Sequence, residues 1–513
     1  MDDSSTILSW LTFLPLVGAM IVANLGRVPS DYLRGVVRAI GCVCLFVTVV
    51  IWLRFDVSSG AIQLEQKLSW IPSLKVFYHL GIDGLGLAMV GLTSVVMLMA
   101  VWSSPKDSNH VYFALMLFLQ SGLYGAFTAL NFFHWFLYWE LCLIPAFFLI
   151  KFYGGMDRTP AAMQFFVYTM VGSIALLVGF MGLFIATGSF DFIELAGMAQ
   201  TGEIVSAVGE NLHWAGLEGE TVYQILAIGV LLGFAVKVPL VPFHTWLPQT
   251  YTQAPTSVTM VLTGVMSKLG LYGLLRLFLP IFPDAIRAMM TPLLILAVVT
   301  VVLAAGAALA QRDIKRIFAY SSVNHLGYCL LGIFAVAAGG AVSGADKAAI
   351  LNGVILQMFN HGITAAALFC FLGYLENRSG GIRGLEDFGG LRKIAPVFCG
   401  LMGVSLFASL GLPGLNGFVG EFLIFKGVFA ISAWAAVLAL PGLLITAVFI
   451  LTLLQKVFSG PLNSRWESMS DLSTEERAII LPATILMFVL GLFPSLLVQF
   501  INPTVIRILG GLN

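Results

Sequence analysis

The sequence predicts an all-α protein that crosses a membrane many times, with about 14 transmembrane helices. Two observations carry this prediction. Hydrophobic residues make up 59% of the 513 residues and charged residues only 10%, against roughly a quarter charged residues in soluble domains. Apolar runs of about 20 residues, the length that spans a bilayer, recur along the whole chain. No stretch is long enough for a separate soluble domain, so we expect a single membrane domain, 1–513.

Charge and cysteine usage exclude several classes of protein. The formal net charge is zero and the pI is near 7, so nothing indicates nucleic acid or an acidic ligand. The six cysteines mostly lie in apolar runs without CxxC spacing, which indicates neither a disulfide framework nor a metal site. No strand pattern followed by GxGxxG is present, so we expect no cofactor site in this chain.

Three helices are predicted in the N-terminal part, 1–109, at 7–26, 34–53 and 80–102. The first lacks the basic flank and small-residue cleavage site of a signal peptide, so we expect it to remain as a membrane helix.

Two sets of five helices follow. The first set, 110–279, is predicted at 110–129, 131–152, 160–187, 223–248 and 255–279. The second set, 289–457, is predicted at 289–310, 315–338, 346–375, 394–430 and 434–457, and a fourteenth helix at 477–500 lies in the C-terminal part, 477–513.

Proline and glycine interrupt one long apolar run in each set. Pro239 and Pro242 interrupt helix 7, while Pro413 and Gly414 interrupt helix 12, because proline removes a backbone donor and clashes with the preceding turn. The breaks stand five helices apart. Interruptions at matching positions of two halves are typical of transporters built from inverted repeats. Because each set has five helices, however, the second set would in any case cross the membrane in the opposite direction to the first.

Basic residues predict the orientation, because Lys and Arg in short loops are retained on the cytoplasmic side. With the N-terminus outside, sixteen of the 26 basic residues fall in inside loops. Seven fall outside: Arg54, Lys67, Lys75, Arg276, Arg287, Lys347 and Arg507. An even number of helices then places both termini on the outer side.

Five charged residues are predicted within helices: Glu140, Lys237, Lys268, Glu421 and Lys426. A charge at the bilayer centre costs about 2.5–3.5 kcal/mol, so such residues usually face a bundle interior or water and mark an ion path. His325 and His361 lie among them, and histidine titrates nearest to neutral pH. Together these groups suit a proton relay. The alternatives are a structural ion pair of Glu140 with Lys237 and histidines that are merely satisfied core residues.

The motifs resemble those of the antiporter-like subunits of respiratory complex I, the proton-pumping NADH:quinone oxidoreductase. Among these subunits, the resemblance is to the subunit M (chain 4) family. The matching segments are Gly81–Leu85 (GIDGL), Trp139-Glu140, Phe234–Pro239 (FAVKVP), Pro242–Pro248 (PFHTWLP), Asp313–Arg316 (DIKR) and Gly420–Phe422 (GEF). Glutamate at position 421 is typical of subunit M, whereas the L and N subunits carry lysine there. One segment departs: similar chains follow Trp-Leu-Pro with Asp-Ala-His, and this chain has Gln249–Gln253 (QTYTQ).

The resemblance implies a proton path in which Glu140 pairs with Lys237 and passes charge to Lys268, His325 and His361 continue the path, and Glu421 is the outlet. It also implies that the partners are other membrane subunits of the complex, especially the antiporter-like L and N paralogues, and that FMN, iron-sulfur clusters and quinone are held in partner subunits. The expected location is the bacterial cytoplasmic (inner) membrane. Two alternatives stay open: a subunit of a multisubunit cation/proton antiporter or membrane-bound hydrogenase, and a scaffold whose buried charges are structural.

Overall fold

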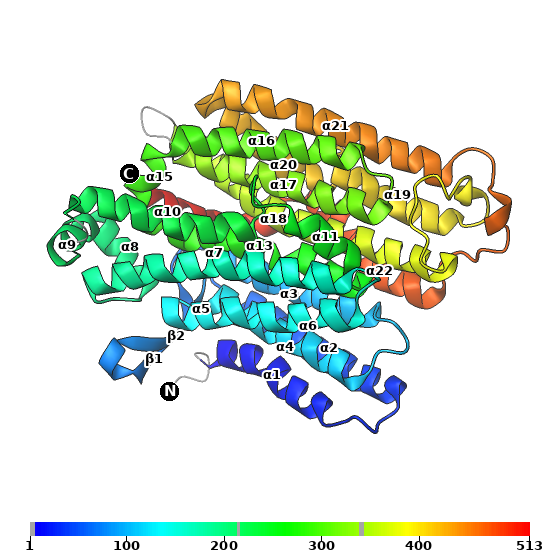
Figure 1. The fold of residues 1–513 in the computed structure, drawn as a ribbon, viewed down its shortest axis with the longest axis horizontal. Coiled ribbons are helices and arrows are strands. Elements are labelled where there is room, and N and C mark those ends of the chain that lie inside the picture. Colours follow the sequence, from blue (N-terminus) through cyan, green and yellow to red (C-terminus); the bar gives the residue numbers. More distant parts are fainter. Residues whose placement is uncertain (1–5, 213–215, 338–342, 513) are drawn as a thin grey trace.

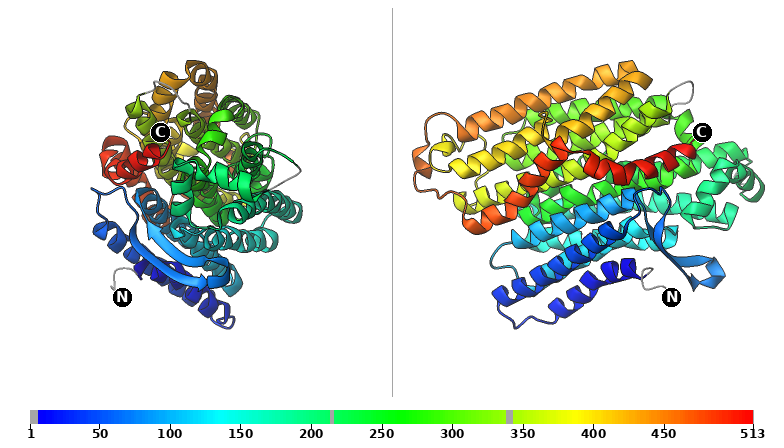
Figure 2. Two further views of the ribbon diagram at one scale, coloured as in Figure 1. Left: turned by 90° about the vertical axis from the view of Figure 1, so that its left-hand side faces the viewer. Right: turned by 180° about the vertical axis from the view of Figure 1, so that it is seen from behind.

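The computed structural model describes residues 6–212, 216–337 and 343–512. Residues 1–5 and 513 of the predicted domain lie outside this part, as does residue 338, where one predicted helix ends. Long, roughly parallel helices fill the molecule, and α1 begins and α23 ends at the same end of the bundle (Figures 1 and 2). We call this the hairpin end.

The N-terminal part packs as a layer along one side of the bundle (Figure 1). Its elements are α1 (Ile7–Ala23), α2 (Ser30–Arg54), β1 (Gln63–Ile71), β2 (Val76–Ile82) and α3 (Gly84–Trp102). The strands form an antiparallel hairpin, which the sequence analysis did not predict; part of β2 was assigned there to the start of a helix.

The next elements contain the first predicted break. They are α4 (His110–Thr128), α5 (Phe132–Leu141), α6 (Leu143–Tyr153), α7 (Arg158–Thr187), α8 (Phe192–Gln200), α9 (Glu203–Asn211), α10 (Gly219–Lys237) and α11 (Trp246–Gln253). Helix α10 ends at Lys237, just before Pro239, and the chain is not helical again until Trp246. The predicted helix 223–248 is therefore two helices with an irregular segment between them.

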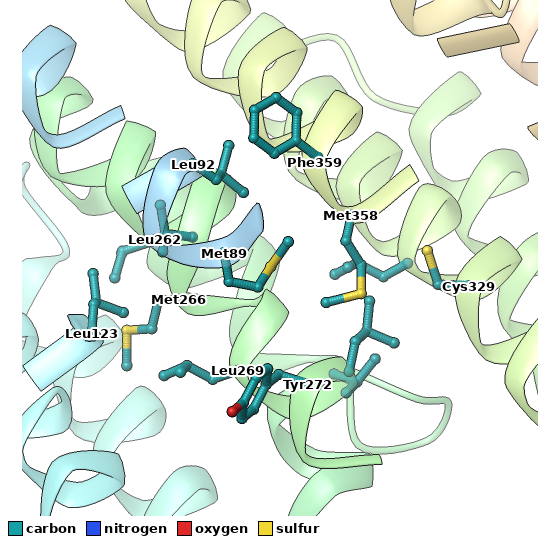
Figure 3. Close-up of a cluster of buried hydrophobic side chains, with 14 of the residues drawn as sticks. Met89, Leu92, Leu123, Leu262, Met266, Leu269, Tyr272, Cys329, Met358 and Phe359 are labelled. Atoms are coloured by element: carbon teal, nitrogen blue, oxygen red, sulfur yellow. The ribbon is translucent and has the colours of Figure 1, made fainter. Parts of the chain in front are cut away.

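The span at 256–281 is irregular in a different way. It consists of α12 (Thr256–Val261), a π-helical turn η2 (Leu262–Met266), α13 (Lys268–Gly273), a second π-helical turn η3 (Leu274–Phe278) and α14 (Leu279–Ile281). Its apolar side chains pack with those of α3, α4 and two later helices, α17 and α18, in the cluster of Figure 3. This span lies at the centre of the bundle and is fully buried.

The remaining helices repeat the pattern of long spans around a break. They are α15 (Pro283–Ala288), α16 (Met290–Leu309), α17 (Ile314–Val336), α18 (Gly344–Ser379), α19 (Pro396–Leu410), α20 (Asn416–Ile431), α21 (Ala433–Phe458), α22 (Thr474–Leu492) and α23 (Ser495–Gly510). Three 3-10 turns also occur, η1 (Pro72–Leu74), η4 (Leu391–Lys393) and η5 (Ser464–Trp466). The predicted helix 394–430 is divided into α19 and α20 at Pro413 and Gly414.

Among the described residues, 11 helices are long and apolar enough to cross a membrane, or 12 if the bent pair α22–α23 is one span. Two shorter apolar helices, α1 and α19, lie beside them. The prediction of a mostly helical protein with many membrane spans is therefore confirmed, and the β1–β2 hairpin is an exception to the all-α class.

Arg276 corrects one assignment of the sequence analysis, which counted it in an outer loop. It lies inside η3, is nearly fully buried, and donates to both carboxylate oxygens of Asp83 at 2.7 and 2.5 Å. Arg507 of α23 donates to the same carboxylate at 2.6 Å. Asp83 also caps α3 by accepting from the Gly86 backbone N–H. The end of the central span that lies near the hairpin end is thus tied to α3 and to the C-terminal helix.

Candidate functional site: a row of buried ionisable side chains

The first break places Lys237 at the last turn of α10. The carbonyl of Val236, freed there, accepts a hydrogen bond from Trp246 Nε1 at 3.0 Å, and the Val241 N–H in the irregular segment donates to Thr300 Oγ1 at 3.0 Å. Irregular backbone at membrane depth is tolerated only where protein or water covers it. Here the side chains of Trp246 on α11 and Thr300 on α16 cover the irregular backbone.

Lys237 is 2% exposed, and its Nζ has no hydrogen-bond partner among the described residues. Instead, Nζ lies 4.4 Å from the centre of the Trp139 ring, whose indole N–H is fixed by a hydrogen bond to Ser173 Oγ at 2.9 Å. A cation over a desolvated indole is stabilised by about 2 kcal/mol. The ring therefore offsets part of the cost of burying this charge.

Glu140 follows Trp139 on α5, and one of its carboxylate oxygens is buried without a hydrogen-bond partner in the described part of the chain. No hydrogen bond or ion pair within 4.0 Å joins Glu140 to Lys237 in the described structure, so the expected pair is not in direct contact. The structure nevertheless brings the two expected partners into one neighbourhood with the Trp139 ring beside the lysine.

Lys268 begins α13 and is fully buried. Its Nζ donates to the Thr263 carbonyl at 2.6 Å and lies 2.7 Å from Nδ1 of His361 on α18. Thr263 belongs to the π-helical turn η2, and π turns are frequent at functional sites because they disturb the regular hydrogen-bond ladder. This turn directs a carbonyl at the ammonium group.

The row continues from His361 to the second break. The rings of His361 and His325 lie 5.1 Å apart between centroids, and His325 Nδ1 lies 3.1 Å from Glu421 Oε1. Gln357 Nε2 donates to the same carboxylate oxygen at 3.1 Å, and His325 Nε2 lies 3.2 Å from Ser409 Oγ. Lys268, His361, His325 and Glu421 thus form one chain of neighbouring groups.

The second break makes room for the end of this row. Gly411 has a φ of +78°, and a Cβ atom there would lie 2.6 Å from Glu421 Oε2. Asn416, the first residue of α20, exchanges two hydrogen bonds with Asn360 of α18, at 2.7 and 3.2 Å. The break is thereby fixed against α18, with the carboxylate lying over the glycine.

Three uncharged groups of this site, Gln357, Ser409 and Thr263, were not singled out in the sequence, because hydroxyl and amide side chains occur in many membrane helices and carry no spacing signal. Lys426, which the sequence analysis grouped with the buried charges, lies with its side chain exposed on the surface of α20 and is not part of the row. In the described part of the chain, no group of three or more His, Cys, Asp or Glu side chains is arranged to hold a metal ion.

This fold and this site define a class: a many-spanning membrane protein with a row of titratable side chains across its interior and a broken helix in each half. A family model described as NADH:quinone oxidoreductase/Mrp antiporter, transmembrane, matches residues 129–447. The chain is 35% identical over 506 residues to NADH-quinone oxidoreductase subunit M of Rhodobacter capsulatus, covering 97% of this chain and 95% of that protein. It is 32% identical to the subunit M of Mycobacterium tuberculosis, with 97% and 93% covered.

Two solved structures share the fold. A chain of respiratory complex I from Thermus thermophilus matches with a TM-score of 0.85 at 24% identity, covering 99% of this chain and all of that one. A chain of the Mrp complex from a Dietzia species matches with a TM-score of 0.84 at 20% identity, covering both chains fully. The protein belongs to the NADH:quinone oxidoreductase/Mrp antiporter family, in its NADH-quinone oxidoreductase subunit M branch.

Proposed function

We propose that this chain carries protons across the membrane as the antiporter-like subunit M of NADH:quinone oxidoreductase. Protons would pass along Glu140, Lys237, Lys268, His361, His325 and Glu421, in that order. The observation that carries the proposal is the succession of neighbouring groups from Lys268 to His361, from His361 to the His325 ring 5.1 Å away, and from His325 to Glu421. Amines, imidazoles and carboxylates all exchange protons, and ionisable side chains that face the interior of a membrane bundle usually mark an ion or proton path.

The chemistry that drives the transfer would take place in other subunits. NADH oxidation, FMN, iron-sulfur clusters and quinone are assigned in this proposal to partners of the same complex, with the L and N paralogues as neighbours in the membrane. The relatives at 30% identity or more that are described above are NADH-quinone oxidoreductase subunits, which favours this assembly over a cation/proton antiporter or hydrogenase of the same fold. The genes beside this one test the assignment: genes for flavin and iron-sulfur subunits would favour the oxidoreductase, whereas a cluster of small hydrophobic subunits without them would favour the antiporter.

The arrangement in the membrane belongs to the same proposal. We assign fourteen spans, counting α1 as one crossing. The adjoining helices α5–α6, the broken α10–α11 and α19–α20 segments, the span at 256–281 and the bent α22–α23 pair also count as one crossing each. Segments 110–279 and 289–457 would be the two inverted repeats, flanked by 1–109 and 477–513. The excess of Lys and Arg in the loops opposite the hairpin end supports an inner-membrane orientation with both termini on the periplasmic side.

Replacement of Lys268 tests the proposal. In membrane vesicles that contain the whole complex, Lys268→Met should reduce NADH-driven proton uptake by about tenfold or more, because a positioned proton-transferring group typically contributes about 10²–10⁴-fold to the rate of its step. Lys426→Met is the matched control, because it removes a lysine from a spanning helix outside the row. Normal uptake by the assembled Lys268→Met complex would contradict the proposal.

A further inference from the structure

Two arginines share one carboxylate near the hairpin end, outside the row. Asp83 accepts hydrogen bonds from Arg276 at 2.7 and 2.5 Å and from Arg507 at 2.6 Å. In the described part of the chain, no other acid forms an ion pair with either guanidinium group. The cluster therefore carries one positive charge that these residues do not balance.

The unbalanced charge is best assigned to Arg507. All three side-chain nitrogens of Arg276 are occupied, two by Asp83 and one by the Tyr272 hydroxyl. Arg507 uses one nitrogen on Asp83, and its side chain is 37% exposed. A guanidinium group carries five N–H donors in a fixed fork. Most of the Arg507 donors therefore have no acceptor among the described residues and are available to a ligand.

A cavity lies beside these donors. Its volume is about 290 Å³, close to the lower end of the roughly 300–1,000 Å³ that is usual for ligand pockets. The charged and amide side chains that line it are Arg276, Arg507 and Gln200, and none of its described lining residues is acidic. The rest of the wall is apolar and includes Phe192, Ile193, Leu275 and Ile508. The cavity thus combines a positive charge with an apolar wall, which suits an anion that carries an apolar chain.

Both arginines lie near the ends of membrane spans. Arg507 stands shortly before Gly510, where α23 ends, and Arg276 shortly before Ile281, where the central span ends. With about 3.6 residues per turn, each arginine is within about two turns of the end of its span. The head groups of phospholipids lie at this level of a bilayer. A lipid beside the cavity therefore brings its phosphate to the depth of the guanidinium groups.

We propose that this cavity binds the phosphate of an anionic phospholipid. Arg507 is the main donor, Arg276 adds positive charge, and the apolar wall covers the first part of an acyl chain. The site goes beyond the proposed function, because none of its residues belongs to the row. Guanidinium binds phosphate through two parallel hydrogen bonds and stays charged at physiological pH.

The lining of the cavity favours a lipid with a net negative charge. A zwitterionic lipid would place a cation beside the arginines, and no acid in the described wall would accept that cation. Free inorganic phosphate would satisfy the arginines but would leave the apolar wall uncovered.

Photolabelling of the whole complex in vesicles tests the site. Phosphatidylcholine vesicles would contain a trace of photoreactive phosphatidylglycerol, which is anionic, and mass spectrometry would identify the labelled peptides. The probe should label segments 192–200 and 507–511 of the wild type. Arg507→Gln should lower this labelling by about tenfold or more, the loss expected when an anion loses a charged hydrogen-bond donor. Arg54→Gln is the matched control, because it removes an exposed arginine that ends α2 and does not line the cavity.

Competition separates the possible sources of the phosphate. An excess of unlabelled phosphatidylglycerol should displace the probe, whereas an excess of inorganic phosphate should not. Equal displacement by inorganic phosphate would overturn the lipid as the ligand. Equal labelling by photoreactive phosphatidylcholine, or by the anionic probe in the Arg507→Gln complex, would show that the cavity does not select charge and would overturn the proposal. Absence of label from both segments of the wild type, the result expected if a partner subunit covers them, would overturn it too.

A second variant leaves the charges in place. Ala196→Phe projects a ring from the α8 wall into the cavity and alters neither Asp83 nor the two arginines. It should lower the labelling as Arg507→Gln does. If the Arg507→Gln complex does not assemble, this variant decides, and labelling at the wild-type level would contradict the site.

Discussion

At the scale of single residues, the buried charges are stabilised in two different ways. Lys268 has a carbonyl and an imidazole within 2.7 Å, whereas Lys237 has the face of Trp139 and the nearby Glu140 charge. A central charge costs about 2.5–3.5 kcal/mol in a membrane helix, and a desolvated cation–π contact offsets about 2 kcal/mol of that. Lys237 is therefore held without being bound to any single acceptor, a condition that suits a group that must release its proton.

The sequence identified the ionisable residues of the row because each stands out in an apolar segment. It did not identify the neutral groups that connect them. Gln357 and Ser409 are chemically ordinary in a membrane helix, and only their contacts with Glu421 and His325 distinguish them. Their role depends on which helices meet, which a local pattern does not contain.

A second cluster of charges lies at the hairpin end, outside the spanning helices. Burial alone would raise the pKa of Asp191, but hydrogen bonds from His79 and Lys67 outweigh burial and lower the pKa to about 2. His79 lies on β2, with Nδ1 2.8 Å from Asp191 and Nε2 2.8 Å from Glu65. Asp191 therefore links the hairpin to α8.

Asp191→Asn should loosen the hairpin at neutral pH. A depressed pKa stabilises the folded state above the unfolded value near 4, and this stability is lost as the pH falls through about 2. The contribution is about 2 kcal/mol, so hairpin amides should exchange hydrogen roughly thirtyfold faster in the variant at pH 7. The difference from the wild type should shrink below about pH 4. Exchange at the wild-type rate at pH 7 would show that Asp191 does not hold the hairpin, and the more exposed Glu194→Gln serves as control.

At the scale of elements, the two helix breaks position the two ends of the row. Both were predicted from Pro239, Pro242, Pro413 and Gly414, because proline and glycine act locally and leave a sequence signal. The β-hairpin and the π-helical turns were not predicted. Two short strands beside an apolar run give little periodic signal, and a π turn depends on the tertiary contacts of a helix whose composition is ordinary.

The second break provides a matched pair of substitutions. Gly411→Ala and Gly414→Ala both place a side chain at a positive φ, +78° and +91°, but only the first brings Cβ to 2.6 Å from Glu421. Both should lose about 1 kcal/mol of stability from backbone strain. Only Gly411→Ala should also displace the carboxylate and markedly reduce proton uptake. Equal uptake by the two assembled variants would show that the position of Glu421 over the glycine is not needed.

At the scale of the whole molecule, the two ends of the bundle differ in charge and in structure. The hairpin end carries β1, β2, α8 and α9, and the opposite end carries most of the basic loops. Arg276, which the sequence analysis counted in a loop on the side of the hairpin end, is instead buried within η3, so that end has one basic loop residue fewer than predicted. Asp83, Arg276 and Arg507 join α3, the central span and α23 near the hairpin end.

Cysteine labelling tests the orientation. A cysteine at the exposed Glu210 of α9 should react with a membrane-impermeant maleimide applied from the periplasmic side. A cysteine at the exposed Glu467, between η5 and α22, should react only after the membrane is permeabilised. The wild type gives the background from the native cysteines. The reverse pattern would invert the proposed orientation.

The most direct test of the proton path is proton uptake by vesicles that contain the complex with Glu140→Gln, compared with the wild type under matched NADH and quinone. Glutamine keeps the size of the side chain and removes its charge and its ability to hold a proton. The account predicts that proton uptake and NADH turnover fall sharply together while assembly stays normal. Unchanged uptake and turnover in an assembled complex would show that Glu140 is structural and would contradict the path that begins there.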